Sequence, residues 1–235
     1  MKITWLGQLS LLIETEQCCI MVDPYLTDNL RENVGKQFTR MLPVKEDYLT
    51  KQPDMILLSH VHGDHTDIPS LTSLMNSGKR VEVLAGAKAW GKVRETIGGK
   101  HNCIQMTPGT EWTFRDVHVK AVPAFHSDET AIGFLIHAEG RTIYITGDTL
   151  YSQAIAEAVN EPVHIMFAVM NGLGNNMNYI DAVRLAKAVG AQCCAPMHWG
   201  MFEAFSADPS QFKSEADTQG VAAWIPTPYK EVKIS

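Results

Sequence analysis

Hydrophobic residues in this chain occur in short runs, which polar and glycine-containing segments separate. Residues 2–14 alternate between apolar and other positions, as expected of a half-buried strand. The run at residues 18–22 predicts a second strand that ends at Asp23-Pro24, because proline cannot continue a ladder. Similar runs predict further strands at residues 55–58, 81–84, 104–106, 112–114, 117–122, 132–137, 142–146, 163–170 and 192–197.

Helices are predicted between several of these strands, at residues 68–76, 87–97 and 151–159. A further helix begins after Asn178, a good amino-terminal cap, and reaches Val189. Residues 27–52 differ from both patterns, since the segment is polar, mixed in charge and too long for a simple connection. We interpret it as a lid over a functional site or as a contact between subunits of a homo-oligomer.

The composition is that of an ordinary soluble α/β protein. A length of 235 residues suffices for one large domain, so we expect residues 1–235 to form a single domain. The net charge of -6 argues against a nucleic-acid partner, and the longest uncharged run, residues 162–180, is too rich in asparagine and glycine to span a membrane. No secretory signal is visible and the cysteines have no metal-ligand spacing, which together predict a cytoplasmic protein with reduced thiols.

The strongest chemical signal is the segment Ser59-His60-Val61-His62-Gly63-Asp64-His65, which directly follows the apolar run at residues 55–58. The carboxyl ends of strands are where α/β sheets place their functional groups. Imidazole nitrogens and carboxylate oxygens are ligands of zinc, manganese and iron. A cluster this dense therefore predicts a metal site.

The spacing His-x-His-x-Asp-His after an apolar strand resembles the signature of the metallo-β-lactamase-fold hydrolases. That family also has a lone histidine, an aspartate and a late histidine further along the chain, and His126, Asp148 and His198 each follow an apolar run in the matching order. The resemblance implies the αββα sandwich of the family, in which two mixed β-sheets pack together and helices cover their outer faces.

The resemblance also implies two divalent ions, zinc or manganese with iron as a further choice, each held by three side chains and joined by one bridging carboxylate. The implied ligands are His60, His62 and His126 for one ion, Asp64, His65 and His198 for the other, and Asp148 between them. A water between two such ions can fall in pKa from about 15.7 towards about 7, which gives hydroxide at neutral pH. We expect Asp64, Asp148 and His198 to form the catalytic centre.

The segment 171–184 narrows the resemblance to one branch. An Asn- and Gly-rich loop that opens a helix, followed by a strand ending in Pro-x-His, looks like the ascorbate-6-phosphate lactonase branch. This similarity implies hydrolysis of a lactone or ester of a small metabolite, with or without a phosphate group, and we expect Asn171, Asn175, Asn176 and Trp199 as substrate contacts. A phosphodiesterase that uses the same ions is the first alternative, and a non-catalytic metal-binding sensor or scaffold is the second.

Several polar residues have two interpretations. Asp23 either supports the metal site, as an aspartate does in related sequences, or only ends a strand. Gln8 stands where many relatives have histidine, so the sequence assigns it no role. The remaining histidines lack a comparable context and are expected on the surface or in the core: His101, His118, His137 and His164.

Overall fold

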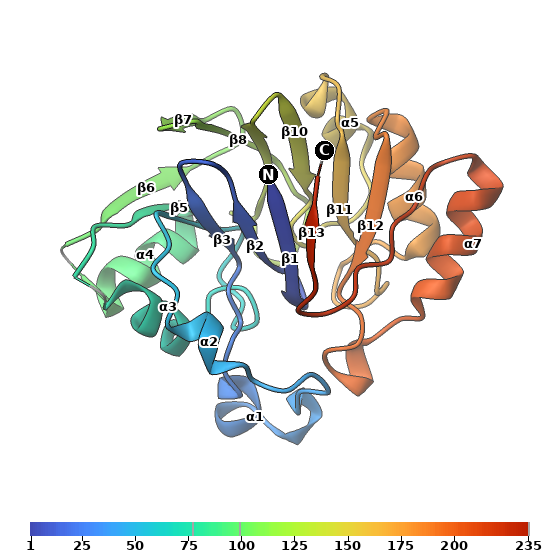
Figure 1. Cartoon of the computed structure of the whole chain (residues 1–235). Helices are drawn as coiled ribbons and strands as arrows, with labels where there is room; N and C mark the ends of the chain where they lie inside the picture. The colour runs from blue at the N-terminus through green and yellow to red at the C-terminus, as the bar shows by residue number, and fades with distance from the viewer. Residues whose placement is uncertain (77, 99, 235) are drawn as a thin grey trace.

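The computed structural model describes residues 1–76, 78–98 and 100–234 and contains two mixed β-sheets that face each other (Figure 1). The strands of the first sheet, in spatial order, are β13 (Glu231–Lys233), β1 (Lys2–Gly7), β2 (Ser10–Glu14), β3 (Cys19–Val22), β4 (Met55–Leu58), β5 (Glu82–Gly86) and β6 (Asn102–Met106). Those of the second sheet are β12 (Cys193–Met197), β11 (Ile165–Val169), β10 (Arg141–Ile145), β9 (Ile132–Ala138), β8 (Val117–Pro123) and β7 (Glu111–Phe114).

The largest core lies between the sheets, where Trp5 and Leu57 of the first sheet share a buried cluster with Phe134 and Phe167 of the second. Two further cores lie between the sheets and the helices outside them. The helices on the side of the first sheet are α3 (Ile68–Met75) and α4 (Ala87–Thr96). Those on the side of the second sheet are α5 (Gln153–Val159), α6 (Tyr179–Ala188) and α7 (Pro209–Gln219). The layers confirm the expected αββα sandwich.

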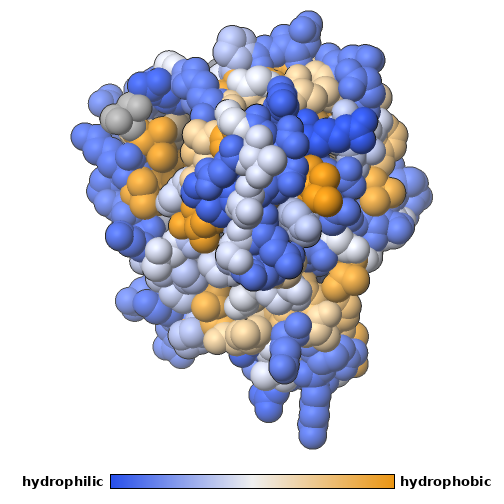
Figure 2. Space-filling model, turned by 90° about the vertical axis from the view of Figure 1, so that its right-hand side faces the viewer, coloured by the Kyte–Doolittle hydropathy of each residue, from blue (hydrophilic) through white to orange (hydrophobic). Residues whose placement is uncertain are grey.

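The outer helices bury their apolar side and expose their polar side, as α7 illustrates. In α7, which packs on α6, Phe212 and Ala216 are buried in the core that α6 shares with the second sheet, whereas Lys213 and Asp217 face outward and pair with each other. On the face that carries this helix, hydrophilic residues predominate and hydrophobic ones form small separate patches (Figure 2). Among the described residues, no helix combines the length and the apolar character that crossing a bilayer requires.

One predicted strand was wrong. Residues 2–14 form a hairpin of β1 and β2 rather than a single strand, because Gly7 and Gln8 both adopt left-handed backbone angles, with φ of 101° and 52°, and reverse the chain. The alternation of apolar residues continues on both sides of this turn, which hides it in the hydrophobic pattern. The other predicted strands and helices are present, with ends that shift by a few residues.

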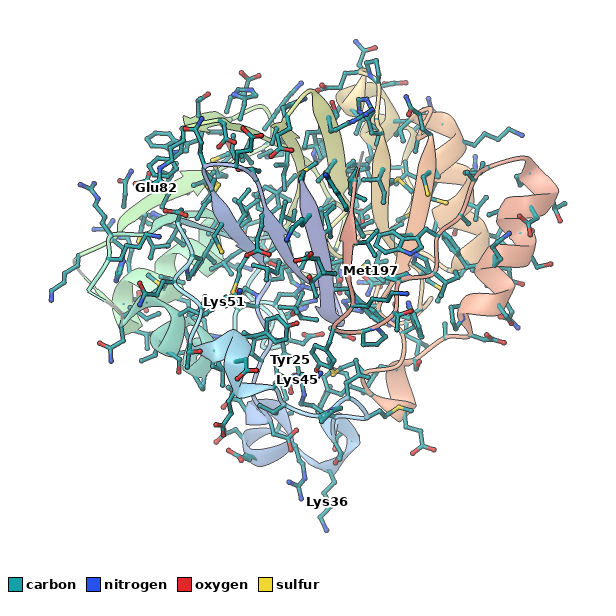
Figure 3. All side chains as sticks on the ribbon, in the orientation of Figure 1. Tyr25, Lys36, Lys45, Lys51, Glu82 and Met197 are labelled. Atoms are coloured by element: carbon teal, nitrogen blue, oxygen red, sulfur yellow. The ribbon has the colours of Figure 1, made fainter. Side chains whose placement is uncertain are left out.

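Residues 27–52 contain three short helices, which the sequence pattern did not predict: α1 (Asn29–Asn33), η1 (Lys36–Phe38) and α2 (Glu46–Leu49). The segment lies below the sheets in Figure 1, and the side chain of Lys36 points away from the body of the molecule at its tip (Figure 3). Its inner side carries Leu30, Phe38 and Leu42, which pack with Tyr25 and Phe202 into a separate small cluster.

Candidate metal centre

The strand directions bring the candidate ligands to one edge of the sandwich. Parallel pairing gives β3 and β4 the same direction in the first sheet, and it does the same for β10, β11 and β12 in the second. Asp23 and the segment 59–65 follow the first pair, whereas Asp148 and His198 follow β10 and β12. Because the carboxyl ends of parallel strands meet at one edge, side chains far apart in sequence come together there.

Local backbone geometry fixes the position of each ligand loop. After β4 the chain turns tightly, and the amide of His65 donates to the carbonyl of His62 at 3.1 Å. Gly147, directly before Asp148, has a φ of 64°, and a Cβ there would lie 2.6 Å from the carbonyl oxygen of Ile132. Only glycine satisfies both constraints, which explains this residue in the strand-like run before Asp148.

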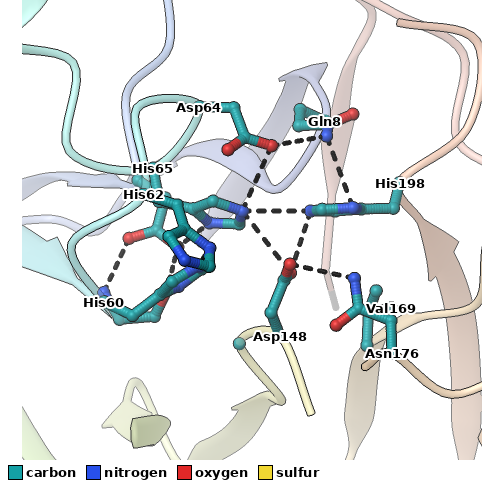
Figure 4. Close-up of polar contacts among 12 residues, drawn as sticks. Gln8, His60, His62, Asp64, His65, Asp148, Val169, Asn176 and His198 are labelled. Atoms are coloured by element: carbon teal, nitrogen blue, oxygen red, sulfur yellow. Dashed lines mark hydrogen bonds and ion pairs between the residues drawn. The ribbon is translucent and has the colours of Figure 1, made fainter. Parts of the chain in front are cut away.

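The structure brings all seven predicted ligands together, six of them in two groups of three and the seventh, Asp148, beside both. The three-histidine group consists of His60, His62 and His126, and the Asp64 group consists of Asp64, His65 and His198. In the first, Nδ1 of His62 lies 3.0 Å from Nε2 of His60 and 3.2 Å from Nε2 of His126. In the second, the Nε2 atoms of His65 and His198 are 3.1 Å apart (Figure 4).

Asp148 lies between the two groups. Its Oδ1 is 2.9 Å from Nε2 of His198 and 3.4 Å from Nε2 of His65, and its Oδ2 is 3.8 Å from Nε2 of His126. Oδ1 is buried yet receives no hydrogen bond from any residue that the structure describes. An acceptor left without a donor among convergent ring nitrogens has the surroundings of a metal ligand.

The donor set fits divalent ions. Zinc bonds to nitrogen of about 2.0–2.1 Å in a tetrahedral site place neighbouring ligand atoms roughly 3.3 Å apart. The nitrogen separations of 3.0–3.2 Å within the groups are close to that value. Nitrogen and oxygen ligands of this kind suit zinc, manganese and iron alike.

Electrostatics favours the protonation states that metal binding needs. Burial lowers the pKa of His60 well below its ordinary value, and burial together with His126 lowers that of His62, so both rings are neutral near pH 7. Burial acts to raise the pKa of Asp148, but the neighbouring His198 and His65 hold it well below its usual range. Neutral imidazoles and an ionised carboxylate are the forms that coordinate a cation.

His65 behaves differently from the other histidines. Burial acts to lower its pKa, but Asp148, Asp64 and Asp23 together raise it well above the ordinary value. A proton on this ring offsets the surrounding carboxylates in the metal-free protein. The site therefore has a need for positive charge that a metal ion would meet.

Asp23 supports the centre, which decides between its two interpretations. Its Oδ2 lies 2.7 Å from Nδ1 of His65, on the side of the ring away from His198, and its Oδ1 accepts the amide of Ser59 at 2.7 Å. A carboxylate in this place fixes the ring and directs Nε2 towards the metal. Asp23, His60 and His65 are also close enough to form a ligand group, but the contact with Nδ1 assigns Asp23 the supporting part.

Sequence reasoning missed two further supports. The side-chain amide of Gln8 donates to Oδ2 of Asp64 at 2.8 Å and lies 3.3 Å from Nδ1 of His198. Asp128 is buried and accepts the amide of Val61 at 3.0 Å, which fixes the backbone between His60 and His62. The position of Asp128 shortly after His126 is the only sequence signal for it, whereas the turn at Gln8 was hidden within a predicted strand.

The proposed substrate contacts occupy different places. Asn171 and Asn176 line a cavity of about 210 Å³ over the metal centre, and the amide of Asn176 also donates to Oδ2 of Asp148 at 2.9 Å. Asn175 is exposed beside His126, whose Nδ1 is 3.2 Å from its carbonyl oxygen. Trp199 does not line the cavity; its indole donates to the carbonyl of Pro196, and its ring packs on Trp5 at 4.8 Å. We therefore assign Trp199 to the core.

An aromatic wall closes one side of this cavity. Phe38 of the segment 27–52 stacks on Phe205 with ring centroids 5.1 Å apart, and Phe202 contacts Phe38 edge to face at 5.5 Å. The segment therefore covers the metal centre, as expected of a lid. The four histidines without context lie elsewhere: His118 and His137 pack together, and His101 and His164 accept backbone amides of Val81 and Thr142.

Comparisons with known proteins agree with this site. A model of the beta-lactamase superfamily domain matches residues 19–199. The chain is 30% identical to a UPF0173 metal-dependent hydrolase of Thermoplasma acidophilum, covering 100% of this chain and 99% of the relative. A UPF0173 metal-dependent hydrolase of Carboxydothermus hydrogenoformans is 28% identical, with 97% of each chain covered.

The fold is shared with Igni18, a metallo hydrolase of Ignicoccus hospitalis, at a TM-score of 0.80 and 22% identity, covering 100% of this chain and 98% of that one. These relatives do not single out the lactonase branch, which stays a prediction. The family match and the full-length relatives do establish the broader class. The chain belongs to the beta-lactamase superfamily domain family and is a metal-dependent hydrolase of the metallo-β-lactamase fold.

Proposed function

We propose that the enzyme hydrolyses an uncharged ester or lactone of a small metabolite, with two divalent ions, zinc or manganese, held by the three-histidine group, the Asp64 group and Asp148. The observation that carries this proposal is the position of Asp148, whose two carboxylate oxygens face different groups. A carboxylate so placed suits a pair of ions, because a single ion would leave one of the two groups without a partner.

When bound, the two ions would lower the pKa of a water molecule towards about 7 and polarise a carbonyl oxygen. The protein supplies the orientation and the surroundings. Asn176 holds Oδ2 of Asp148 at 2.9 Å, and Gln8 holds Oδ2 of Asp64 at 2.8 Å, so both carboxylates keep a fixed direction. Phe38 and its aromatic neighbours keep bulk water from one side of the cavity, which strengthens electrostatic interactions inside it.

The lining of the cavity favours an uncharged substrate. Among the described residues that line it, none is a lysine or an arginine. Arg184, at the end of the segment 171–184, does not line the cavity and packs over the ring of Tyr151 at 4.0 Å. Apart from the ligand groups, a phosphate on the substrate would therefore meet only uncharged donors, the side-chain amides and the Ser127 hydroxyl, so we favour a neutral lactone or ester over the phosphorylated form.

Metal analysis and a substrate panel test this proposal together. Gently purified protein should contain two ions per chain and should hydrolyse simple lactones or aryl esters faster than bis(nitrophenyl) phosphate. Replacing Asp148 with Ala should lower kcat/KM by more than about 100-fold, because the loss of a ligand should exceed that of an outer contact. A single ion under metal-replete conditions would refute the paired site, and hydrolysis of the phosphodiester alone would establish the phosphodiesterase alternative.

A further inference from the structure

A second cavity, of about 550 Å³, opens beside the metal centre on the other side of His126. His126 lines both this cavity and the smaller one over the metal centre. We call the larger cavity the side pocket, and its walls include Met106, Phe125, Ala131 and Leu150. Its volume lies within the range of about 300–1,000 Å³ that is usual for small-molecule sites.

The walls of the side pocket are built from the same loops that carry the metal ligands. Phe125 directly precedes His126, and Leu150 lies two residues after Asp148. The amide of Leu150 donates to the carbonyl of Phe125 at 2.8 Å, and the amide of Phe125 donates to the Thr149 hydroxyl at 2.8 Å. These bonds join the two loops, so the pocket wall has a fixed position relative to the metal centre.

The chemistry of the side pocket selects an apolar occupant. Phe125 and Leu150 are both 45% exposed, although large apolar side chains are usually covered. Glu129 is the one charged residue among the described residues that line the pocket, and its carboxylate pairs with Nζ of Lys88 at 2.5 Å. A charged ligand would find no unpaired side chain of opposite charge among the described residues of this lining, whereas an aliphatic or aromatic group would cover the exposed apolar surface.

We propose that the side pocket binds the apolar substituent of the substrate while its ester or lactone carbonyl lies at the metal centre. This inference rests on the proposed function and adds the substrate class: a neutral lactone or ester that carries an alkyl or aryl group. The cavity over the metal centre, at about 210 Å³, lies below the range of about 300–1,000 Å³ that is usual for small-molecule sites, and the side pocket extends the space beside it. His126 separates the two parts and would lie beside the bond between them.

A chain-length series tests the inference through activity. The metal-loaded enzyme should hydrolyse γ-decalactone with a kcat/KM at least about tenfold above that for γ-butyrolactone, since each buried methylene adds to binding. Leu150→Asp should reduce this ratio by about tenfold. The matched control is Ile180→Asp, which changes an equally exposed apolar residue outside both cavities and should leave the ratio unchanged.

Binding of unreactive lactams separates this inference from the proposed function. 1-Octyl-2-pyrrolidinone should bind at least about tenfold more tightly than 1-methyl-2-pyrrolidinone by calorimetry, and Leu150→Asp or Phe125→Ala should remove that difference. Equal binding of the two lactams, or a difference that both variants retain, would overturn the inference. Lactam binding that depends on Leu150 in a protein that hydrolyses no lactone or ester would instead overturn the proposed function and keep the side pocket as an apolar ligand site.

Discussion

The ligands of the metal centre are held by residues that do not themselves belong to the ligand groups. Asp23 fixes His65, Gln8 contacts Asp64 and His198, and Asn176 contacts Asp148. Outer contacts of this kind decide how well a site retains its metal and how strictly the ligands are oriented. They also explain why so many polar side chains are tolerated at a buried position, since these contacts satisfy most of them and leave Oδ1 of Asp148 for a cation.

Gln8→Ala tests whether these outer contacts support the metal centre, at the residue to which the sequence assigned no role. Loss of the amide that donates to Asp64 at 2.8 Å should weaken metal retention or kcat by about 10- to 100-fold. Metal content after dialysis and kcat of the reloaded protein measure the two effects. Gln17→Ala, at an exposed residue, is the control and should change neither. Unchanged metal retention and kcat in Gln8→Ala would show that this contact is dispensable.

The sequence was most informative where the ligands are dense. His60, His62, Asp64 and His65 occupy six consecutive positions, so their function could be predicted without a structure. Gln8 could not be assigned, because its contact with Asp64 depends on a turn that brings together residues 56 positions apart. Trp199 was predicted as a substrate contact, but His198 has a left-handed φ of 63° after the end of β12, and the Trp199 ring then packs on Trp5. The sequence carries no signal for this bend.

At the scale of elements, Arg40 links the part of the lid next to Phe38 to the chain before it. Nη1 of Arg40 donates to the carbonyl of Tyr25 at 2.8 Å, its Nε donates to that of Leu42 at 3.2 Å, and its guanidinium lies over the Tyr25 ring. The amide of the next residue, Met41, donates to the carbonyl of Met201. These contacts join residues 36–44 to the loop after His198, so Phe38 keeps its place over the cavity.

Arg40→Leu should therefore loosen the lid. Losing hydrogen bonds from a charged group should cost about 2 kcal/mol of local stability and raise KM, because Phe38 would no longer form a fixed wall. Hydrogen exchange at the Met41 amide should become at least about tenfold faster. Lys36→Leu, which changes an exposed cation at the tip of the same segment, is the control (Figure 3). Equal exchange rates in both variants would contradict the role of Arg40.

A second contact between elements, centred on Asp54, joins the two sheets away from the edge that carries the metal centre. Oδ1 of Asp54 lies 2.8 Å from Nζ of Lys79 and 2.8 Å from Nη1 of Arg115, and its Oδ2 accepts the amide of Cys19 at 2.9 Å. Arg115 belongs to the turn between β7 and β8 in the opposite sheet. Burial acts to raise the pKa of Asp54, but Lys79, the Cys19 amide and Arg115 together hold it below its ordinary value.

This direction of shift predicts how Asp54→Asn changes stability with pH. A carboxylate with a lowered pKa in the folded state stabilises fully above its unfolded pKa of about 3.9, and the effect is lost as pH falls through the lower folded value. Asp54→Asn should therefore cost about 2 kcal/mol at pH 7 and progressively less below pH of about 4. Urea unfolding at pH 7 and below pH of about 4 measures the stability cost. The control is Glu231→Gln, in an exposed pair with Lys2, which should cost under about 1 kcal/mol. A cost that did not change with pH would exclude the charge as its cause.

The pattern of hydrophobic residues predicted most helices and strands. It did not predict β13 and α7, which contain few regularly spaced hydrophobic residues. The strand β13 has only three residues and exists because it pairs with β1 at the far end of the chain. The helix α7 buries mainly Phe212 and Ala216, a weak stripe in a polar segment. In both, contacts with distant residues decide the structure, and such contacts are not visible in a local window.

For the whole molecule, the metal centre connects the two sheets. His60, His62 and the Asp64 loop follow β4 of the first sheet, whereas His126, Asp148 and His198 follow strands of the second. Each ligand group takes at least one member from each sheet. Bound ions would therefore stabilise the packing of the two halves as well as the active edge.

Chelation should consequently lower the stability of the entire fold. An ion at 100 times its Kd contributes about 2.7 kcal/mol, which for a protein of this size corresponds to roughly 5–10 °C in Tm. Calorimetry of metal-loaded and chelator-stripped protein measures the difference, and added zinc or manganese should restore it. In Asp148→Ala, chelation should lower Tm by less than it does in the parent protein. In His118→Asn, a change remote from the site, chelation should lower Tm by as much as in the parent. Identical melting with and without metal would contradict a centre that joins the sheets.

The order of the ligands along the chain has a consequence for how the centre fills during synthesis. The three-histidine group is complete once residue 126 has emerged from the ribosome, whereas the Asp64 group requires His198, and Asp148 comes between them. A nascent chain would thus offer one nitrogen-rich site early and gain the second only near its end. We expect ribosome-bound chains halted before His198 to retain at most one ion each, and released chains to take up the other.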